Sequence, residues 1–178
     1  MIKNVIVFIF IIFSTPINSQ EKLADLLKDG NKIIFIRHAN APGNGDPANF
    51  RLNDCSTQRN LNNEGIIQSK KIGEFFLKNR IQVDKVLSSE WCRCKDTAKF
   101  AFNGYSTYDA LNSFYDPRFK NNKDKQISEL KDYINNWKSK KNLVLITHFV
   151  VISEILKVNA SSGEIIVSDK RFNIIARY

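Results

Sequence analysis

The sequence predicts an α/β fold, with one domain built as a three-layer α/β/α sandwich around a mostly parallel central sheet. Short apolar runs rich in β-branched residues alternate with stretches that carry apolar residues at helical spacing. The 178 residues are enough for one domain with a sizeable core. The chain has two histidines, His38 and His148, and each closes an apolar run. Ligands of α/β sheets bind outside the carboxyl ends of the strands, so both histidines are candidate site residues.

The first strand is predicted at residues 33–36, four apolar and mostly β-branched residues. A helix at residues 21–28, with leucines at helical spacing, precedes this strand and ends in turn residues. The polar stretch 40–59 contains two prolines and two glycines, so it is a loop beside the candidate site. Asn62 is a suitable N-cap for the next helix, whose small residues would let it lie close to the sheet.

The rest of the chain continues the same alternation of strands and helices. The predicted elements are a strand at 83–89, a helix at 91–102, a short strand at 105–108, a polar loop at 112–123, an amphipathic helix at 125–138, a strand at 143–147, a helix at 149–157 and two last strands at 164–168 and 172–178.

The composition is that of an ordinary globular protein, with 43% hydrophobic and 25% charged residues. The formal net charge of +9 favours anionic ligands, including phosphorylated molecules, and loose association with an anionic membrane surface. No arginine-rich tract or basic helix indicates nucleic-acid binding, so we do not expect a nucleic-acid partner.

The N-terminus has the pattern of a secretory signal peptide. Lys3 provides a positive start, residues 5–13 form a nine-residue apolar run, and residues 14–19 break it. The run is too short for a standard membrane span. We therefore expect a signal peptide at residues 1–19, a mature domain at residues 20–178 and a periplasmic or secreted location. The alternative is an uncleaved signal anchor.

Three cysteines, Cys55, Cys92 and Cys94, allow one disulfide and leave one thiol in an oxidising compartment. Pairing of Cys55 with either Cys92 or Cys94 would tie the long loop to the start of a helix, and three unpaired buried thiols are the alternative. The spacing of Cys92 and Cys94, with no histidine nearby, suits zinc poorly, so we expect no metal site.

Four segments together resemble the histidine phosphatase superfamily, whose fold is that of phosphoglycerate mutase. In the family's order, they are Arg37-His38-Ala39, Leu61-Asn62-x-x-Gly65-x-x-Gln68, Ser89-x-x-x-Arg93-x-x-x-Thr97-Ala98 and Thr147-His148. The resemblance covers roughly residues 32–103 and 142–157. Two further segments, Cys55-x-x-Gln58-Arg59-Asn60-Leu61 and Trp91-Cys92-Arg93, resemble an exported bacterial branch associated with heptose phosphates of the lipopolysaccharide core.

The resemblance implies a metal-independent phosphatase that needs no cofactor and acts on a phosphorylated small molecule or glycan. His38 would be the nucleophile that becomes phosphohistidine, and neighbouring arginines would keep its imidazole neutral. Arg37 and Arg93 would clamp the phosphoryl group, because guanidinium forks match its oxygens. His148 would donate to an equatorial oxygen. Substrate-binding candidates are Arg59 and Asn44.

The chain departs from the family pattern at the general acid. Ser113 and Phe149 stand at the two positions where relatives carry a carboxylate. Asp116 and Glu154 are candidate substitutes, as is Asp109. Without an acid, the enzyme should prefer substrates with good leaving groups over simple alkyl phosphates. A catalytically idle phosphoglycan-binding protein of the same fold is the alternative, and a mutase is less favoured.

Overall fold

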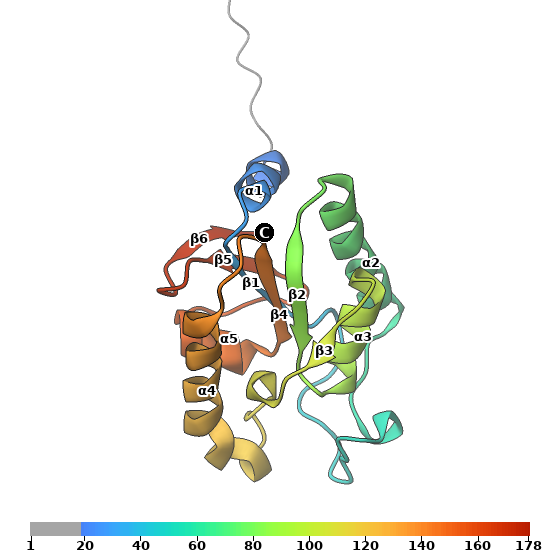
Figure 1. Ribbon diagram of the computed structural model, residues 1–178. Coiled ribbons are helices and arrows are strands. Elements are labelled where there is room, and N and C mark those ends of the chain that lie inside the picture. The colour runs from blue at the N-terminus through green and yellow to red at the C-terminus, as the bar shows by residue number, and fades with distance from the viewer. Residues whose placement is uncertain (1–18) are drawn as a thin grey trace, which may run out of the picture.

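The computed structural model describes residues 19–178. The predicted signal peptide, residues 1–19, lies outside the described residues except for Ser19, at which the first helix begins. Helices α2 and α3 cover one face of a central sheet and α4 and α5 cover the other, which makes three layers (Figure 1). The helices and strands are α1 (Ser19–Lys28), β1 (Ile33–Arg37), α2 (Asn63–Lys78), β2 (Val83–Ser88), α3 (Cys92–Ala101), β3 (Ser106–Thr107), α4 (Lys123–Asn136), β4 (Asn142–Thr147), α5 (Phe149–Leu156), β5 (Ile165–Ser168) and β6 (Ile174–Arg177), with short 3-10 helices at Cys55–Thr57, Asp109–Leu111 and Pro117–Asn122.

The six strands form one sheet in the order β3-β2-β4-β1-β5-β6. Strands β1, β4, β2 and β3 are parallel, whereas β5 and β6 run antiparallel to their neighbours. The predicted α/β sandwich with a mostly parallel sheet is therefore confirmed. β1 and β4 are adjacent at the centre, and Arg37 pairs with Thr147 in their register. The carboxyl ends of these two strands consequently lie side by side.

Side-chain alternation along β1 divides the apolar core into two halves. Ile34 and Ile36 pack with α1, α2 and α3, whereas Ile33 and Phe35 pack with α4 and α5. All four side chains are fully buried. A strand buried on both faces reads as a continuous apolar run, which is why this stretch carries no polar residue before Arg37. The two core halves fix the sheet from both sides and leave its carboxyl edge for polar residues.

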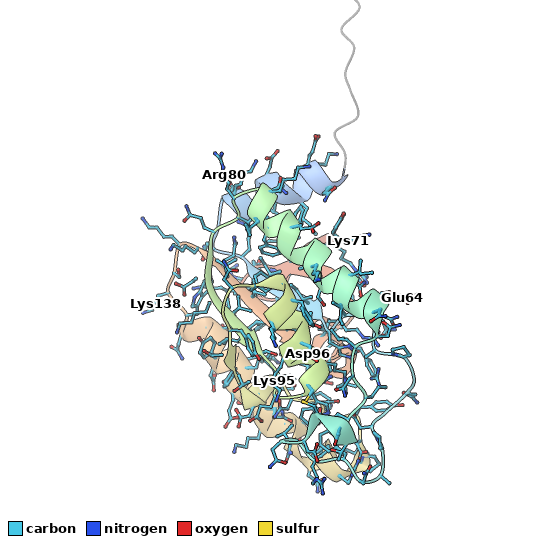
Figure 2. The ribbon with its side chains drawn as sticks, turned by 90° about the vertical axis from the view of Figure 1, so that its right-hand side faces the viewer. Glu64, Lys71, Arg80, Lys95, Asp96 and Lys138 are labelled. Carbon is cyan, nitrogen blue, oxygen red and sulfur yellow. A yellow bond between two sulfur atoms is a disulfide. The ribbon has the colours of Figure 1, made fainter. Side chains whose placement is uncertain are left out.

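Helix α2 begins where predicted, because the Asn62 side chain accepts a hydrogen bond from Gly65 N at 2.9 Å. The expectation that its small residues face the sheet is wrong for Gly73. A Cβ added there would lie 2.3 Å from the Ala101 carbonyl oxygen, so this glycine allows close packing against α3. The charged residues Glu64 and Lys71 lie on the exposed side of α2 (Figure 2).

Two predicted segments differ in detail from the structure. The predicted loop at 112–123 contains a 3-10 helix, which begins with Pro117 and is capped by the Asp116 side chain. The last strand starts at Ile174 instead of residue 172, because the Asp169 carboxylate accepts hydrogen bonds from the backbones of Arg171 and Asn173 and closes a turn. Among residues 19–178, no helix has the length and apolar character needed to cross a membrane.

Candidate active site

The two histidines meet at the carboxyl edge of the sheet. His38 follows β1 and His148 follows β4, and His38 N donates to Thr147 O at 2.9 Å. The ring centroids are 5.4 Å apart in an edge-on arrangement. Both side chains line one small pocket of about 60 Å³. A larger cavity of about 840 Å³ lies beside α2 and β5, but neither histidine lines it, so the chemistry belongs to the smaller pocket.

The His38 ring has a defined tautomer. Its Nδ1 lies 2.9 Å from the Ala39 carbonyl oxygen, which can only accept, so Nδ1 carries the hydrogen. The lone pair is therefore on Nε2, which has no hydrogen-bond partner within residues 19–178. Burial, followed by the charge of Arg93, lowers the pKa of His38 well below its usual value. A neutral imidazole with a free Nε2 lone pair is what a nucleophile requires.

A chain of hydrogen bonds connects His148 to a polar network behind the pocket. His148 Nε2 lies 2.9 Å from Ser89 Oγ, and Ser89 Oγ donates to Asn112 Oδ1 at 3.0 Å. The Asn112 amide is oriented by Glu90, whose backbone N donates to Oδ1 and whose carboxylate accepts from Nδ2. When the Ser89 hydroxyl donates its hydrogen to Asn112, Ser89 Oγ accepts a hydrogen bond from His148 Nε2, which then carries the ring hydrogen. His148 Nδ1 has no partner in the described part of the chain.

The Ser89 hydroxyl can also turn its hydrogen toward His148. Asn112 Oδ1 would keep the hydrogen bond from Glu90 N, and His148 would carry its own hydrogen on Nδ1. Burial, followed by the charges of Arg93 and His38, lowers the pKa of His148 well below its usual value. A neutral His148 with Nδ1–H can donate to a phosphoryl oxygen. The Ser89 hydroxyl and the Cys94 thiol, whose Sγ lies 3.5 Å from His148 Nε2, are the two groups that can donate to Nε2 and so favour this tautomer.

Three arginines, Arg37, Arg59 and Arg93, line the same pocket. Arg37 donates from Nη1 to Ala160 O at 2.8 Å, and Arg59 donates from Nε to Gly45 O at 2.8 Å and from Nη1 to Ala41 O. Burial, followed by the charge of Arg93, lowers the pKa of both Arg37 and Arg59. The Nε atoms of Arg37 and Arg93 are buried and have no hydrogen-bond partner among residues 19–178. Buried donors without acceptors are costly, and an oxyanion would satisfy them.

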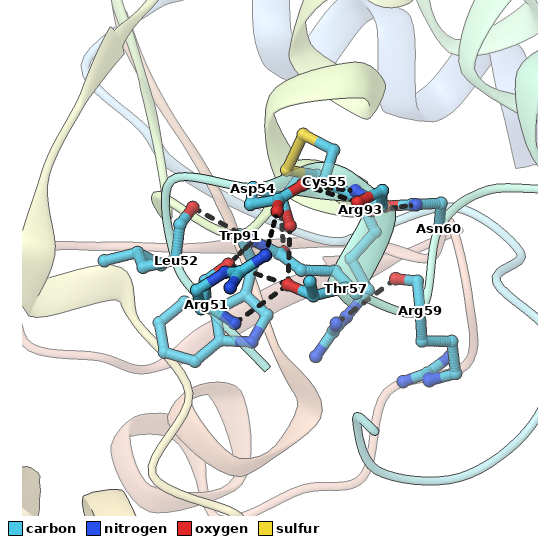
Figure 3. The surroundings of a disulfide bond; sticks show 12 residues. Arg51, Leu52, Asp54, Cys55, Thr57, Arg59, Asn60, Trp91 and Arg93 are labelled. Atoms are coloured by element: carbon cyan, nitrogen blue, oxygen red, sulfur yellow. Dashed lines mark hydrogen bonds and ion pairs between the residues drawn. A yellow bond between two sulfur atoms is a disulfide. The ribbon is translucent and has the colours of Figure 1, made fainter. Parts of the chain in front are cut away.

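A disulfide joins the long loop to the helix that carries Arg93. Cys55 is bonded to Cys92, which selects one of the two predicted pairings (Figure 3). Gln58 Oε1 accepts from Cys92 N at 2.9 Å and reinforces the connection. Cys94 is the free cysteine; burial raises the pKa of its thiol to about 12, so it remains protonated. Arg93 follows Cys92 directly, and Figure 3 shows it beside the bridge and hydrogen-bonded to Arg59 O.

Asp46 is a pocket residue that the sequence analysis missed. Its carboxylate receives hydrogen bonds from Arg93 Nη1 at 2.8 Å and Nη2 at 3.2 Å, Arg59 N at 3.0 Å and Trp91 Nε1 at 3.1 Å. Burial raises the pKa of Asp46, but the hydrogen bonds and charge of Arg93 outweigh it, and the net effect is a lowered pKa. The only signal in the sequence is an aspartate between Gly45 and Pro47, which is also the composition of an ordinary turn.

The predicted substrate and acid residues are divided between the pocket and the surface. Asn44 lines the pocket and donates to Tyr115 Oη at 3.3 Å. Asp116 also lines it, but hydrogen bonds from Arg118 lower the pKa of Asp116 to about 2. Glu154 does not line the pocket; it pairs with Lys123 at 3.0 Å and Lys157 at 3.2 Å.

The position of Glu154 argues against the predicted role as general acid, because helix α5 carries this residue about 1.7 turns beyond His148. Ser113 and Phe149 line the pocket at the places where a carboxylate was expected. Within residues 19–178, no group of three or more histidine, cysteine or acidic side chains is arranged to hold a metal ion.

Comparison with known proteins identifies the family and the fold. The model of the histidine phosphatase superfamily (branch 1) matches residues 33–145. The fold is similar to that of the protein histidine phosphatase SixA complexed with tungstate, at a TM-score of 0.54 and 15% identity over 82% of this chain and 95% of that chain. It is also similar to phosphoglycerate mutase from Thermus thermophilus, at a TM-score of 0.55 and 18% identity over 82% of this chain and 97% of that chain. No curated protein sequence matches the chain. Because the family model covers more than half of the sequence, the chain belongs to the histidine phosphatase superfamily, branch 1.

Proposed function

We propose that the chain is an exported, metal-independent phosphatase that hydrolyses a phosphomonoester through a phosphohistidine intermediate. The observation that carries the proposal is the unpartnered Nε2 of a neutral His38 in a pocket lined by three arginines. His38 Nε2 would form a bond to phosphorus while the bond from phosphorus to the leaving oxygen breaks. Water would then attack phosphorus, break the P–N bond, and release inorganic phosphate and the neutral imidazole.

The arginines and His148 would stabilise the charge that develops in this reaction. Arg37 and Arg93 each have a buried Nε–H that finds no acceptor within the described residues, and a phosphoryl oxygen would supply one. The Nδ1–H of His148 would add a neutral donor to an equatorial oxygen. Preorganised donors of this kind act more strongly in a closed site than in water.

Substrate preference follows from the state of the carboxylates around the pocket. Asp46 and Asp116 both line it, and hydrogen bonds to arginines lower the pKa of each. Neither is therefore poised to protonate a leaving oxygen, which would take its proton from solvent. The substrates should be those with good leaving groups, such as phosphoramidates, anhydrides, anomeric sugar phosphates and aryl phosphates. Phosphorylated sugars of the lipopolysaccharide core are the natural class that the sequence motifs favour.

Export has two independent supports. Residues 1–19 have the composition of a signal peptide. The Cys55–Cys92 disulfide requires an oxidising compartment to persist, as in the periplasm or outside the cell. Fractionation of cells that express the full chain should recover it outside the cytoplasm with Gln20 as its first residue. Recovery of a reduced, uncleaved protein in the cytoplasm would refute export.

The activity is tested by phosphate release from the mature protein in the presence of excess chelator. The substrates would be p-nitrophenyl phosphate, phosphoramidate, an anomeric sugar phosphate and a 6-phosphorylated sugar, with His38→Ala as the control. We expect chelator-resistant turnover that falls at least about 10³-fold in the variant. The anomeric phosphate should react faster than the 6-phosphate. Turnover that needs a metal, or that survives His38→Ala, would contradict the mechanism.

A binding protein of the same fold is the second candidate, because no carboxyl group in the pocket is poised as an acid. That protein would bind inorganic phosphate with the arginines intact and release none from any substrate of the panel. Acid-labile phosphate on His38 after mixing with p-nitrophenyl phosphate would exclude it.

A further inference from the structure

Asp46 receives more hydrogen bonds than any other carboxylate that lines the pocket. Its Oδ1 accepts from Arg59 N and Arg93 Nη1, and its Oδ2 accepts from Trp91 Nε1 and Arg93 Nη2. The side chains of Asp46 and Arg93 are only 10% and 4% exposed to solvent. This ion pair is therefore sheltered from water, unlike the other aspartate–arginine pairs at Asp54 and Asp116.

Asp46 occupies one edge of the Arg93 guanidinium and leaves a second edge free. A guanidinium has five N–H groups. Asp46 takes one from each Nη atom, and the second hydrogen of Nη1 faces Arg59 O at 3.4 Å. The two that remain are Nε–H and one hydrogen of Nη2, which point the same way on the side-on edge. Nε is buried and has no hydrogen-bond partner in the described part of the chain, so this edge lacks an acceptor there.

We propose that Asp46 is a positioning residue for Arg93. It holds the edge of the guanidinium formed by Nη1 and Nη2, and it leaves the side-on edge, formed by Nε and Nη2, for the phosphoryl group. The inference rests on the proposed function for the identity of the bound anion. Asp46 stays in place when phosphate binds, because the two acceptors use different edges of one planar group. The four donors around the carboxylate hold its geometry before the substrate arrives. Arg93 is then already oriented, and less side-chain freedom is lost on binding.

The experiment is a double-mutant cycle between Asp46 and Arg93. The four proteins are the wild type, Asp46→Ala, Arg93→Lys and the double variant. Two quantities are measured for each: the Kd of inorganic phosphate by titration calorimetry, and kcat and KM for p-nitrophenyl phosphate. We expect Asp46→Ala to weaken phosphate binding about 10-fold or more in the wild-type background and less than about 3-fold beside Arg93→Lys, since lysine has no second edge to orient.

Asp54→Ala is the matched control, because Asp54 lies in the same loop and pairs with Arg51 on the surface. Its phosphate Kd should equal that of the wild type, which separates general damage to the loop from loss of the Arg93 contact. If Asp46→Ala does not fold, Asp46→Asn replaces it in the cycle. The amide oxygen of asparagine would still accept from Arg59 N and Arg93 Nη1, but its NH2 group would face the N–H donors of Trp91 and Arg93 Nη2. The coupling with Arg93 should therefore remain, and phosphate affinity should fall less than in Asp46→Ala.

Three results would overturn the inference. Tighter phosphate binding by Asp46→Ala would mean that the carboxylate competes for the phosphate position. An equal loss in both Arg93 backgrounds would mean that Asp46 acts independently of Arg93. A wild-type phosphate Kd in both Asp46 variants would mean that Arg93 needs no positioning. Coupling in phosphate affinity without any turnover would instead refute the proposed function and leave the role of Asp46 intact.

Discussion

Removal of the Cys55–Cys92 disulfide should lower the stability of the protein by about 4 kcal/mol. The bridge closes a loop with a sequence separation of 37 residues. In the chain-entropy account, the bond lowers the conformational entropy of the unfolded chain. The resulting gain in stability grows with the logarithm of loop length, from about 3 kcal/mol for 15 residues to about 4.7 kcal/mol for 100. A loop of this size falls between those values. For a folded domain of this length, the loss corresponds to a fall of about 10 °C in Tm.

The assay is urea unfolding of Cys55→Ser/Cys92→Ser beside the wild type, each with and without dithiothreitol. The wild type should fall to the stability of the double variant when reduced, whereas the variant should not respond. Cys94 serves as the internal control, because its buried thiol forms no disulfide and is present in all samples. A difference below about 1 kcal/mol, or a response of the variant to reductant, would refute the reasoning from loop closure.

The same bond should affect ligand binding, because Arg93 follows Cys92 and the bridged loop carries Arg59 and Asp46. Loss of the bridge frees the loop relative to α3, so phosphate must order it on binding. We expect KM to rise more than kcat falls when the protein is reduced at a temperature at which it stays folded. A fall in kcat with unchanged KM would show that the bridge acts on the chemical step.

Three further perturbations test the histidine site and its supports. Below pH 6.5 the free energy of unfolding should fall by up to about 1.4 kcal/mol per pH unit for each histidine. The reason is that the pKa values of His38 and His148 are lowered in the folded protein, so the unfolded chain binds these protons at a higher pH. Urea unfolding at a series of pH values should show a weaker pH dependence in His148→Asn, and an unchanged pH dependence would contradict the burial argument. Gly65→Ala should lower the free energy of unfolding by about 1–3 kcal/mol and lower kcat, because the new Cβ would lie 2.1 Å from the carbonyl oxygen of Asn40, two residues after His38. A wild-type Tm would refute the close approach. Ser89→Ala should lower kcat about 10-fold or more at nearly constant KM, because the nearer of the two groups that can donate to His148 Nε2, and so favour a hydrogen on Nδ1, is lost. An unchanged kcat would exclude that role.

The fold could be predicted largely because local patterns and tertiary packing agree. The run 33–36 is apolar at every position because helices cover both faces of β1, and this is the pattern from which the strand was predicted. The Asn62 cap was predicted because a single side chain determines where α2 begins. Gly73 was misassigned because a small residue indicates a close approach but not the partner, which proved to be α3.

The site could be predicted where the sheet determines it and not where the loop does. His38, Arg37 and His148 are placed at one edge of the sheet by the register of β1 and β4, so their positions at strand ends predicted that they lie together. Their roles were predicted from the resemblance to the family. The path of residues 40–59 depends on long-range contacts, because the disulfide and the Arg93–Asp46 pair connect positions 37 and 47 residues apart. No local pattern encodes such separations, which is why the cysteine pairing stayed open and Asp46 was missed.

A general acid is not predictable from the sequence, for a related physical reason. Residue type identifies every carboxylate in the chain, but its protonation depends on the donors that surround it. Glu154 pairs with two lysines outside the pocket, whereas Asp116 and Asp46 line the pocket, and each accepts hydrogen bonds from an arginine. Arg93, which lines the pocket, stabilises the Asp46 carboxylate as an anion, and Arg118, which does not line it, does the same for Asp116. Under the proposed function, both carboxylates are therefore held as anions and cannot act as the acid, so the leaving group of the substrate has to compensate.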